Sequence, residues 1–500
     1  MLSAWVFVYS AVLTLRALWC WRQGGLRVAH IAREQREVAR EWSAGPPPPT
    51  IQVVLFLPML REQGNVRDLF EALNRLDFPA EHLLVVPITT ERETADQADR
   101  TRAAQALLED LEARRTGARF FWKHSRSFPV RKLSAWVKTF QRDEEGRREV
   151  RAALQSALEQ PTTRECVERA LAEGASRAPS FHVHFPGVRG NKATQMNHAL
   201  DVLRERGVLA HPERTYIGVY DADSRPHPLS LASLALAAHK DLAPAFQQYP
   251  IYLKGAERLG PLMRNEAWLQ TARSLCVEYP RQLEVNRALL QGRMAGRTFT
   301  YCIGHGEFLR ADWLLRARFP ELQPIDDLPT GYMLSLAGQR IVPLPFFDVC
   351  EVADSLPEFI HQTSTWFAGQ SDYRDPPARA ARHFGPIPLV RAVRGRVEQV
   401  LANVQWATLG LVRLGVLGAC LLTGSWAAGL VVLMAFTLEA AVNWGLALRL
   451  VEGHLDAEHL PRLAYRWSSV ARPLFSSVGP CTYLLRRLFA QELPRYKTER

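Results

Sequence analysis

Two aspartates stand one residue apart directly after an apolar run in the middle of the chain. The run over 216–220 predicts a buried strand, and Asp221 and Asp223 follow it at once. Ligands of parallel sheets bind beyond the carboxyl ends of the strands. Two carboxylates at such an end can hold a hard divalent cation, Mg²⁺ or Mn²⁺, and leave positions open for phosphate oxygens. The pair Asp-x-Asp is common by itself, so it is the preceding strand that favours a metal site here.

Two further polar segments could act on the same ligand. Lys192 stands in a glycine-containing loop before an expected helix over 197–203, where backbone N–H groups and the helix dipole favour phosphate. An ordinary surface lysine is the alternative. Asp326 and Asp327 are adjacent carboxylates among apolar residues, and such a pair can raise one carboxyl pKa and supply a general base. A helix N-cap is the alternative role for Asp326.

Side chains that suit a sugar come next to these acidic groups along the chain. Gln362 precedes Trp366 by four residues, so a ring that stacks on an acceptor sugar would have an amide beside it. Core packing is the alternative for Trp366. His305 lies between Gly304 and Gly306, in a turn that could meet a ligand, although such a histidine is more often satisfied within its own turn.

The elements that must position these residues follow an α/β pattern. Helical spacing over 66–76 separates the first two of several short apolar runs, which lie at 51–57, 82–88, 181–185 and 216–220. Strands and helices that alternate at this spacing predict a parallel sheet. From 94 to 178 the sequence turns to Arg, Glu, Ala and Leu with helical periodicity. This segment is expected to be a helical insertion with a solvated charged face.

Composition sets the outer limits. With 500 residues, 47% hydrophobic and 23% charged, the chain is too ordinary for a disordered, collagen-like or coiled-coil protein. Lys plus Arg is 62 and Asp plus Glu is 51, a formal charge of +11 that suits anionic ligands or a membrane surface. The seven cysteines are scattered without a CxxC pair, so neither a zinc cluster nor a disulfide framework is expected, and a reducing compartment fits. Nucleic-acid binding is not expected, because the soluble region does not interleave basic and aromatic residues.

Two parts of the sequence are apolar enough for a membrane. Residues 1–22 are mostly apolar and predict an uncleaved anchor. In residues 399–448, only Arg413 and Glu439 are charged. This stretch is long enough for two membrane crossings, with a hairpin turn at 423–425. Both charges would then lie deep in the bilayer, where isolated charges are costly, so they are predicted to pair. A single span over 414–438 is the alternative.

Arginines flank both apolar parts and predict the orientation. By the positive-inside rule, the soluble region over 46–375 is expected on the cytosolic side of a multi-pass protein. The apolar hairpin is then placed at 397–450, and the mixed aromatic and basic segment over 460–500 is expected to lie in the membrane interface. A third span near 463–485 is the alternative.

Taken in order, these motifs resemble the membrane-embedded family 2 glycosyltransferases, the group that includes cellulose and hyaluronan synthases. The likeness is carried by Leu57-Pro58 to Glu62, Phe78-Pro79, Lys192 to Asn197, Asp221 to Asp223, Asp326-Asp327 and Gln362 to Trp366, and by the closing Tyr496 to Arg500. The resemblance implies a GT-A type, Rossmann-like domain with a helical insertion, flanked by transmembrane helices in a plasma (inner) membrane. It also implies inverting sugar transfer from a nucleotide-diphosphate sugar to a glycan or lipid-linked acceptor during polysaccharide synthesis for the cell envelope.

The same resemblance assigns roles to single residues. Asp223, supported by Asp221, is expected to hold Mg²⁺ or Mn²⁺, and Asp327 is expected to be the base that takes the acceptor proton. The donor and its nucleotide are expected to meet Glu62, Glu91, Lys192 and Asp221. The acceptor is expected to meet Gln362, Trp366, Asp326 and His305.

Two departures from the family pattern bear on the product. Thr89-Thr90-Glu91 stands where the family has an Asp pair, and Glu91 is the substitute for it. Thr365 replaces the arginine of the family's QxxRW motif, which argues against a long-chain processive synthase. The alternatives are a transferase that loads one sugar onto a polyprenyl phosphate, and a non-catalytic membrane scaffold with a degenerate transferase domain.

Overall fold

A mixed, mostly parallel sheet forms the centre of the protein. The computed structural model describes residues 2–45, 49–124, 128, 130–158, 161–293, 299–321, 325, 327–372, 376–455 and 476–489. The strand order in the main sheet is β3-β2-β1-β4-β8-β6-β9. Its strands are β1 (Gln52–Pro58), β2 (Leu83–Thr90), β3 (Val183–Phe185), β4 (Thr215–Val219), β6 (Ala245–Gln247), β8 (Glu307–Arg310) and β9 (Ile341–Pro343). The four predicted strands are therefore present, each with shifted ends.

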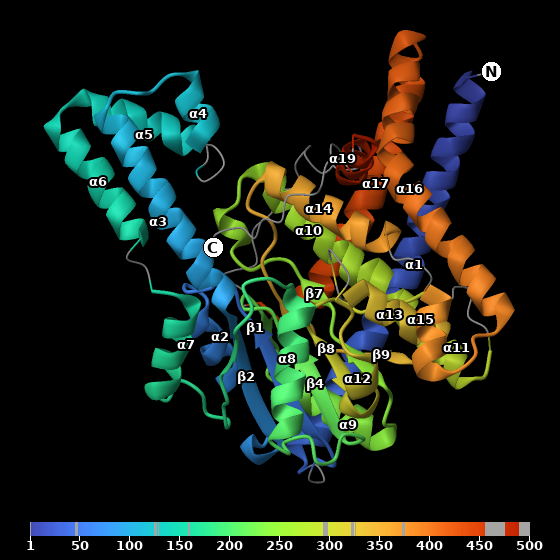
Figure 1. Cartoon of the computed structure of the whole chain (residues 1–500). Coiled ribbons are helices and arrows are strands. Elements are labelled where there is room, and N and C mark those ends of the chain that lie inside the picture. The colour runs from blue at the N-terminus through green and yellow to red at the C-terminus, as the bar shows by residue number, and fades with distance from the viewer. Residues whose placement is uncertain are drawn as a thin grey trace.

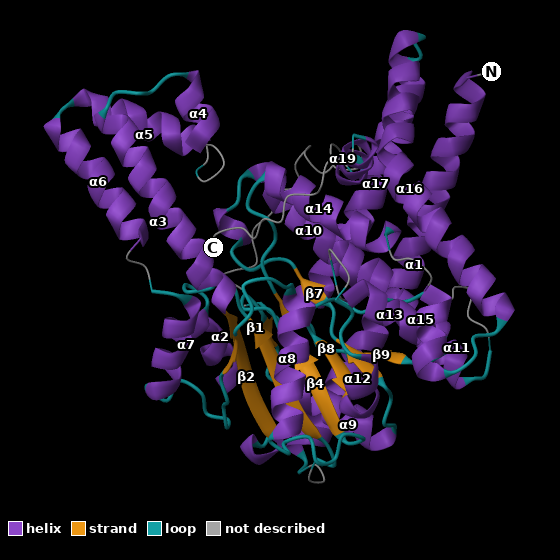
Figure 2. Ribbon diagram, in the orientation of Figure 1, coloured by secondary structure: helices purple, strands orange, loops and turns teal. Residues whose placement is uncertain are grey.

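Both faces of the sheet are covered by helices, as the unbroken apolar runs require. In β1, Val53 and Leu55 pack into one core and Val54 and Phe56 into the other, which is the alternation of a pleated strand. The helices over the first face are α2 (Val66–Asn74), α7 (Thr163–Ala172) and α9 (Ser230–Lys240). Those over the second are α8 (Lys192–Glu205), α12 (Ala311–Ala317) and α13 (Asp327–Leu336). Figure 2 shows the strands between these layers.

One antiparallel strand determines which loops lie at the carboxyl edge of the sheet. Strand β4 runs parallel to β1, and β1 parallel to β2, so these three strands end at the same edge. Strand β8 is antiparallel to β4, with Glu307 opposite Val219. The residues that precede β8 therefore lie beside those that follow β4. A small sheet of β5 (Arg225–Pro226), β10 (Asp348–Val349) and β7 (Pro250–Ile251) adjoins.

Four helices lie in the segment expected as a helical insertion over 94–178; they begin three residues earlier and end at Leu158, because α7, also inside that range, packs on the sheet. The four are α3 (Glu91–Glu112), α4 (Ala118–His124), α5 (Val130–Arg142) and α6 (Glu144–Leu158). Thr90 starts α3 because its hydroxyl accepts from the Arg92 N–H, an N-cap that was not expected from the sequence. These four helices project away from the sheet (Figure 1) around a core of their own that includes Leu107, Phe120 and Leu133.

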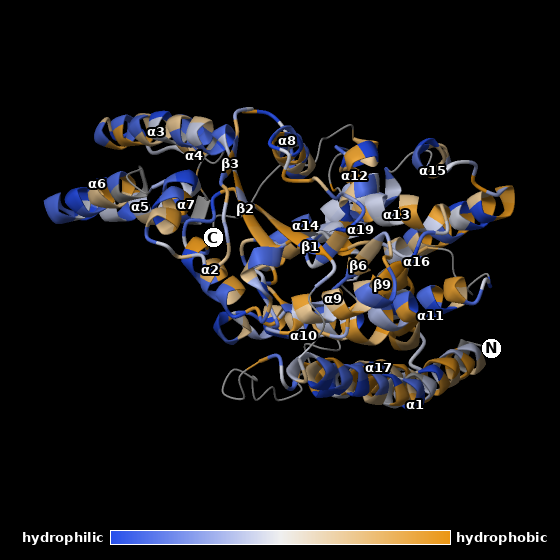
Figure 3. Ribbon diagram, turned by 90° about the horizontal axis from the view of Figure 1, so that it is seen from below, coloured by the Kyte–Doolittle hydropathy of each residue, from blue (hydrophilic) through white to orange (hydrophobic). Residues whose placement is uncertain are grey.

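Among the residues that the structure describes, three helices are long and apolar enough to cross a membrane: α1 (Leu2–Ser43), α16 (Leu389–Leu422) and α17 (Trp426–Val451). The expected turn separates α16 from α17, and Gly424 adopts a positive φ there. The expected anchor over 1–22 is only the first half of α1, which continues without a break to Ser43. Its second half buries Ile31 and Trp42 against the soluble region, and Figures 1 and 3 show it beside α17.

The predicted ion pair in the apolar hairpin forms and has a third member. An Arg413 Nη2–H donates to Glu439 Oε2 at 3.0 Å, and Arg16 of α1 lies 3.7 Å from the other oxygen of Glu439. The Arg413 guanidinium also packs over the Phe436 ring at 4.8 Å. One glutamate thus joins all three apolar helices.

Shorter helices complete the molecule. They are η1 (Ala80–His82), η2 (Ala256–Arg258), α10 (Pro261–Arg273), the π-helix η3 (Ser274–Glu278), α11 (Tyr279–Leu290), α14 (Leu356–Ser371), α15 (Pro376–Phe384) and α19 (Val478–Leu488). Helix α19 is the described part of the segment expected in the membrane interface. It buries Tyr483 beside α14 and leaves Leu485, Leu488 and Phe489 exposed. The family-like tail at 496–500 lies outside the described residues.

Candidate active site

The loop after β4 carries the two aspartates of the predicted metal site. Asp221 is partly exposed, whereas Asp223 is 7% exposed and its Oδ2 accepts from the Glu351 backbone N–H at 3.3 Å. The loop is held from below because the Ser224 hydroxyl donates to the buried Asp348 carboxylate at 2.7 Å. Asp221 therefore faces outward while Asp223 is fixed at the floor of the site.

Lys192 reaches this loop from the start of α8. The helix begins at Lys192 and not at 197 as expected, because the Asn191 side chain accepts from the Thr194 N–H at 3.0 Å in a capping box. The Lys192 ammonium donates to Asp221 Oδ1 at 2.7 Å. It also donates to the Gly304 carbonyl. The lysine is thus a cation at a helix N-terminus, next to the outer aspartate.

Gly304 connects this cluster to Asp327. Its carbonyl accepts from Lys192, and its backbone N–H donates to Asp327 Oδ2 at 2.7 Å. A larger residue at this position would crowd the same carboxylate, since a Cβ on Gly304 would lie 3.2 Å from Asp327 Oδ2. The structure therefore brings Asp221, Lys192 and Asp327 together around one glycine, although they are far apart in the sequence.

Burial governs the chemistry of Asp327. Loss of solvent raises the pKa of the Asp327 carboxyl, while backbone N–H donors and the Lys192 charge oppose the shift. Asp327 is the first residue of α13, and its Oδ1 accepts from the Leu328 N–H at 2.8 Å. A partly desolvated carboxylate whose pKa is raised is a suitable proton acceptor. The neighbouring Asp326 lies outside the described residues.

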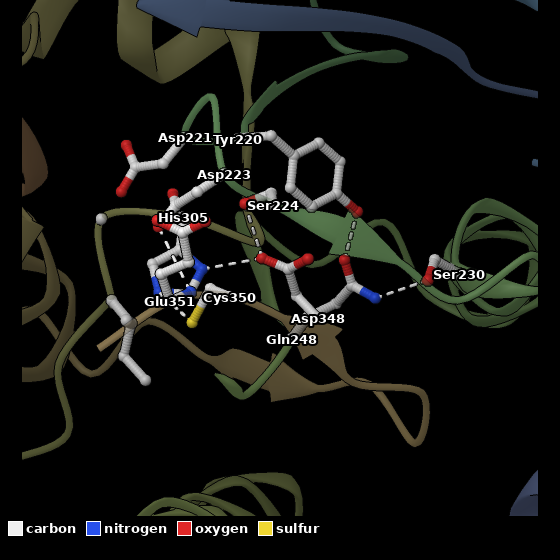
Figure 4. A network of polar contacts seen from close by, with 12 residues as sticks. Tyr220, Asp221, Asp223, Ser224, Ser230, Gln248, His305, Asp348, Cys350 and Glu351 are labelled. Atoms are coloured by element: carbon white, nitrogen blue, oxygen red, sulfur yellow. Dashed lines mark hydrogen bonds and ion pairs between the residues drawn. The ribbon is translucent and has the colours of Figure 1, made fainter. Parts of the chain in front are cut away.

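His305 occupies a different place from the acceptor contact expected of it. Its ring is 8% exposed, and Nδ1 lies 2.8 Å from Asp348 Oδ2, which also accepts from Ser224 (Figure 4). Burial by itself lowers the pKa of His305, but Asp348 and the two aspartates of the β4 loop more than offset it. Burial raises the pKa of Asp348 in turn. The structure favours the alternative of a histidine satisfied inside the fold, where it ties the loop before β8 to β10.

The two aspartates fit a divalent cation by their chemistry. Carboxylate oxygens suit Mg²⁺ and Mn²⁺, and Mg²⁺ is commonly bound by one or two carboxylates together with substrate phosphates. Within the described ranges, no three His, Cys, Asp or Glu side chains gather into a ready-made metal site. Asp221 and Asp223 would thus be two protein ligands, with diphosphate oxygens needed to complete the shell.

Glu62 and Glu91 lie at the ends of the two neighbouring strands. Glu62 is nearly buried after β1, where Oε2 accepts from the Asn65 amide at 2.8 Å. Glu91 opens α3 directly after β2, and its Oε2 lies 3.1 Å from His184 Nε2 on β3. Both glutamates are at the carboxyl edge of the sheet. Glu62 supports its own loop, whereas Glu91 and His184 form a polar pair at the position expected for the nucleotide.

No protein-family model and no curated protein matches the chain. Solved structures with some similarity include a mannosyltransferase and the protein TarS. The mannosyltransferase PcManGT from Pyrobaculum calidifontis, in complex with GDP-Man and Mn²⁺, aligns at a TM-score of 0.40 and 15% identity over 98% of this chain and 100% of that one. Residues 1–349 of S. aureus TarS, in complex with UDP-GlcNAc, align at 0.32 and 12% identity over 81% and 92%. At such TM-scores these similarities do not establish a shared function.

Gln362 and Trp366 lie on α14. Helix α14 packs against the segment before Asp327, because a Cβ on Gly369 would lie 2.1 Å from the Ile325 side chain. Trp366 is about one turn from that contact and is partly exposed. Among the described residues, Gln362 Oε1 has no hydrogen-bond partner although it is buried. Trp366 is therefore the nearer of the two to the segment before Asp327, Gln362 lies about one turn farther from it, and their role toward an acceptor stays a prediction.

Several residues of this site could not be found from sequence motifs. Asp348, Ser224 and Gln248 carry no recognisable spacing, yet they form the buried floor of the site (Figure 4). The Gln248 amide donates to Ser230 at 2.7 Å, and its oxygen accepts from the Tyr220 hydroxyl. Their one sequence signal is a polar residue next to an apolar run, such as Asp348 after Phe347. That signal is too common to select them.

The packing of α13 makes a first prediction. A Cβ on Gly331 would lie 2.2 Å from the Cys302 nitrogen and 2.3 Å from the Tyr301 Cα, so backbone must move. We expect Gly331→Ala to lower the free energy of unfolding by about 1–3 kcal/mol and to displace Asp327 from Gly304. Thermal unfolding measures the first effect. Gly445→Ala, a helical position with nothing within 4 Å, is the control, and equal melting temperatures for both variants would contradict the prediction.

Proposed function

We propose that this protein is an inverting glycosyltransferase of the membrane-embedded family 2 type, with a GT-A type catalytic domain. It transfers a sugar from a nucleotide-diphosphate sugar to a glycan or lipid-linked acceptor. The observation that carries the proposal is the link through Gly304, which receives Lys192 on its carbonyl and holds Asp327 with its N–H. This link places a cation, an outer aspartate and a desolvated carboxylate around one point, as a displacement on an activated sugar requires.

The donor side of the reaction belongs to the β4 loop and the start of α8. Lys192 and the N-terminus of α8 would bind the diphosphate, since both carry positive charge toward it. Asp223 and Asp221 would hold Mg²⁺ or Mn²⁺, which supplies charge neutralisation on the leaving nucleoside diphosphate when bound. Lys192 now pairs with Asp221, so donor binding would exchange this ion pair for contacts with phosphate.

The acceptor side belongs to Asp327. Its carboxylate would take the proton of the acceptor hydroxyl as that oxygen attacks the anomeric carbon. A single positioned base, with no second carboxylate acting as a nucleophile, corresponds to one displacement and inversion of configuration. Trp366 would stack on the acceptor sugar, and Gln362 would offer an amide oxygen that is buried and has no hydrogen-bond partner among the described residues.

The membrane setting is part of the same proposal. Helices α1, α16 and α17 would cross the inner membrane, and the sheet would lie on the cytosolic side, where the flanking arginines favour it. The buried floor of hydrogen-bonded groups under Asp221 and Asp223 supports an enzyme over a scaffold with a degenerate site.

A panel of nucleotide sugars tests the proposal on the full-length protein in detergent. We expect release of a nucleoside diphosphate with at least one donor, lost when EDTA removes divalent cations and restored by Mn²⁺ or Mg²⁺. Identification of the product by mass spectrometry and NMR would give the anomeric configuration. Failure of every donor to bind or to turn over would reject the transferase.

The raised pKa of Asp327 predicts the acid side of the pH profile. Because burial raises this pKa, the base is protonated at a higher pH than an ordinary carboxyl, and kcat/KM should fall as pH drops through that value. Lys192 lowers the pKa, so in Lys192→Met the midpoint should move to higher pH. Lys240→Met, on the distant end of α9, should leave the midpoint where it is. An unchanged midpoint in Lys192→Met would remove Asp327 as the titrating base.

A further inference from the structure

A second polar cluster lies between the active-site loop and the foot of the apolar hairpin. Arg273, the last residue of α10, donates from Nε to Glu278 Oε1 at 2.8 Å. The Tyr301 hydroxyl donates to the same glutamate oxygen at 2.5 Å. On its other side, the Arg273 guanidinium lies over the Trp406 ring of α16 at 5.4 Å from its centroid. None of these four residues belongs to the donor site described above.

A π-helix creates this cluster. In a regular helix, the ring of Pro280 would clash with the carbonyl of Cys276, four residues earlier. The chain instead widens into η3 over Ser274–Glu278 before α11 begins. Such single π-turns are often found at functional sites. Here the π-turn brings Glu278 back to Arg273 and leaves the guanidinium between α16 and the loop that holds Tyr301.

Arg273 is the exposed member of this cluster. Its side chain is 47% exposed, against 13% for Glu278. Arg273 uses Nε for its hydrogen bond to Glu278, and its side chain also interacts with Tyr301, so only part of the guanidinium's set of N–H donors is engaged within the cluster. Burial alone lowers the pKa of Arg273, and Glu278 and Tyr301 more than offset it, so the guanidinium stays charged. A planar fork of N–H groups of this kind suits the paired oxygens of a phosphate.

The place of this fork connects the membrane with the proposed base. Trp406 lies in α16 where the helix enters its apolar half, and tryptophan prefers the membrane–water interface. The same π-turn touches α17, because the Cys276 thiol donates to the Asn443 carbonyl at 3.7 Å. Tyr301 is three residues before Gly304, whose backbone N–H donates to Asp327. Helix α13 packs at Gly331 on the backbone of Tyr301 itself. Arg273 is thus at the interface level and one short loop from Asp327.

We propose that Arg273 binds the phosphate of a lipid-linked sugar acceptor, with Trp406 against the first part of the lipid chain. The inference rests on the proposed glycosyltransferase function and adds the acceptor class to it. The lipid tail would leave along the apolar face of α16, where Leu411, Val412 and Leu414 are exposed. The sugar of the carrier would extend from the phosphate toward Tyr301 and Asp327. Glu278 would hold the fork in place and weaken its attraction for anions, because it carries the same sign of charge as the ligand.

Two variants with opposite expected effects test the proposal. Binding of farnesyl phosphate to the full-length protein in detergent is measured by microscale thermophoresis, with farnesol as the ligand without phosphate. We expect Arg273→Gln to weaken farnesyl phosphate binding about tenfold or more, because a charge-assisted pair is lost. We expect Glu278→Gln to strengthen it several-fold, because the competing carboxylate is neutralised. Arg258→Gln, a highly exposed arginine on η2, is the matched control and should bind as the wild type does.

The outcomes separate a binding role from a structural one. If the cluster only supports the fold, both Arg273→Gln and Glu278→Gln should weaken binding, and the proposal is overturned. It is equally overturned if farnesol binds as well as farnesyl phosphate. Inorganic phosphate and phosphatidylglycerol micelles are the two remaining arms. If either depends on Arg273 as strongly as farnesyl phosphate does, the site is a general phosphate site and the acceptor assignment fails.

A separate assay keeps this test independent of the transferase proposal. Release of nucleoside diphosphate with water as the acceptor depends on the donor site alone. We expect Arg273→Gln to retain that release while transfer to a lipid-linked acceptor falls at least tenfold. Loss of both reactions in Arg273→Gln would mean that the arginine serves the donor site, against the inference. Absence of both in the wild type would reject the transferase, whereas phosphate binding could still be measured.

Discussion

Asp327→Asn is expected to lower kcat by a factor on the order of 10² to 10⁴, the usual contribution of a positioned general base. The amide keeps the size of the carboxylate but cannot accept the acceptor proton. Both carboxylate oxygens accept backbone N–H groups, from Gly304 and Leu328, so the substituted side chain also loses one hydrogen bond. Steady-state transfer rates and donor affinity, measured on the same preparations, check this expectation.

The donor site gives this experiment its internal reference. Asp223, Asp221 and Lys192 are unchanged in Asp327→Asn, so the affinity for the donor should stay within a few-fold of the wild type while kcat falls. Asp201→Asn is the matched control. Asp201 lies on the part of α8 away from Lys192, and it pairs with Arg318 at the end of α12. A retained kcat in Asp327→Asn would show that another group takes the proton. A lost donor affinity would show that Asp327 serves the nucleotide.

Glu439→Leu is expected to cause the largest loss of stability among single changes in the apolar helices. Glu439 accepts from Arg413 at 3.0 Å and lies 3.7 Å from Arg16. Arg413 is nine residues before the end of α16 at Leu422, or about 14 Å along the helix. Removal of the one carboxylate leaves a buried guanidinium without its counter-charge, which costs about 3–5 kcal/mol. Unfolding of the protein in nanodiscs measures the loss.

The double variant decides whether pairing is the cause. Arg413→Leu together with Glu439→Leu removes both charges, and we expect it to be more stable than Glu439→Leu alone. Arg16 is largely exposed at 58%, so it is expected to add little to the effect. Additive losses in the double variant would contradict the pairing and leave only lost packing around Phe436 as the cause.

The sequence predicted those features of the fold that depend on one local pattern of residues. The apolar runs predicted strands β1, β2 and β4 because both faces of these strands are buried, and the charged pair in the hairpin was predicted because isolated charges in lipid are costly. The start of α8 was placed five residues too late, because the Asn191 cap depends on Thr194 and carries no strong pattern. The continuation of α1 beyond the expected anchor, to Ser43, was also not predicted.

The lower part of the site could not be predicted because it depends on pairing across the sheet. His305 meets Asp348 since β8 runs antiparallel to β4 and since β10 belongs to a second sheet. Neither fact follows from spacing along the chain. The same holds for Arg273, which reaches Glu278 through a π-turn, whereas regular helical spacing would place the two residues on different sides. Short motifs in the sequence predicted the aspartates of the site. The hydrogen-bond partners that fix them come from segments that only the tertiary fold brings together.

The unbroken course of α1 has a mechanical consequence. The helix has 42 residues, which is about 63 Å at 1.5 Å per residue. Its far end is fixed to the soluble region, where Trp42 stacks on Phe78 with an angle of 9° between the rings and Gln35 donates to the Pro345 carbonyl at 2.7 Å. A helix clamped in this way cannot hinge between its apolar first half and the sheet, so under the proposed function it would hold the Asp327 site at a constant height above the bilayer. A lipid-linked acceptor would then have to travel to Asp327, because the site could not lean toward it.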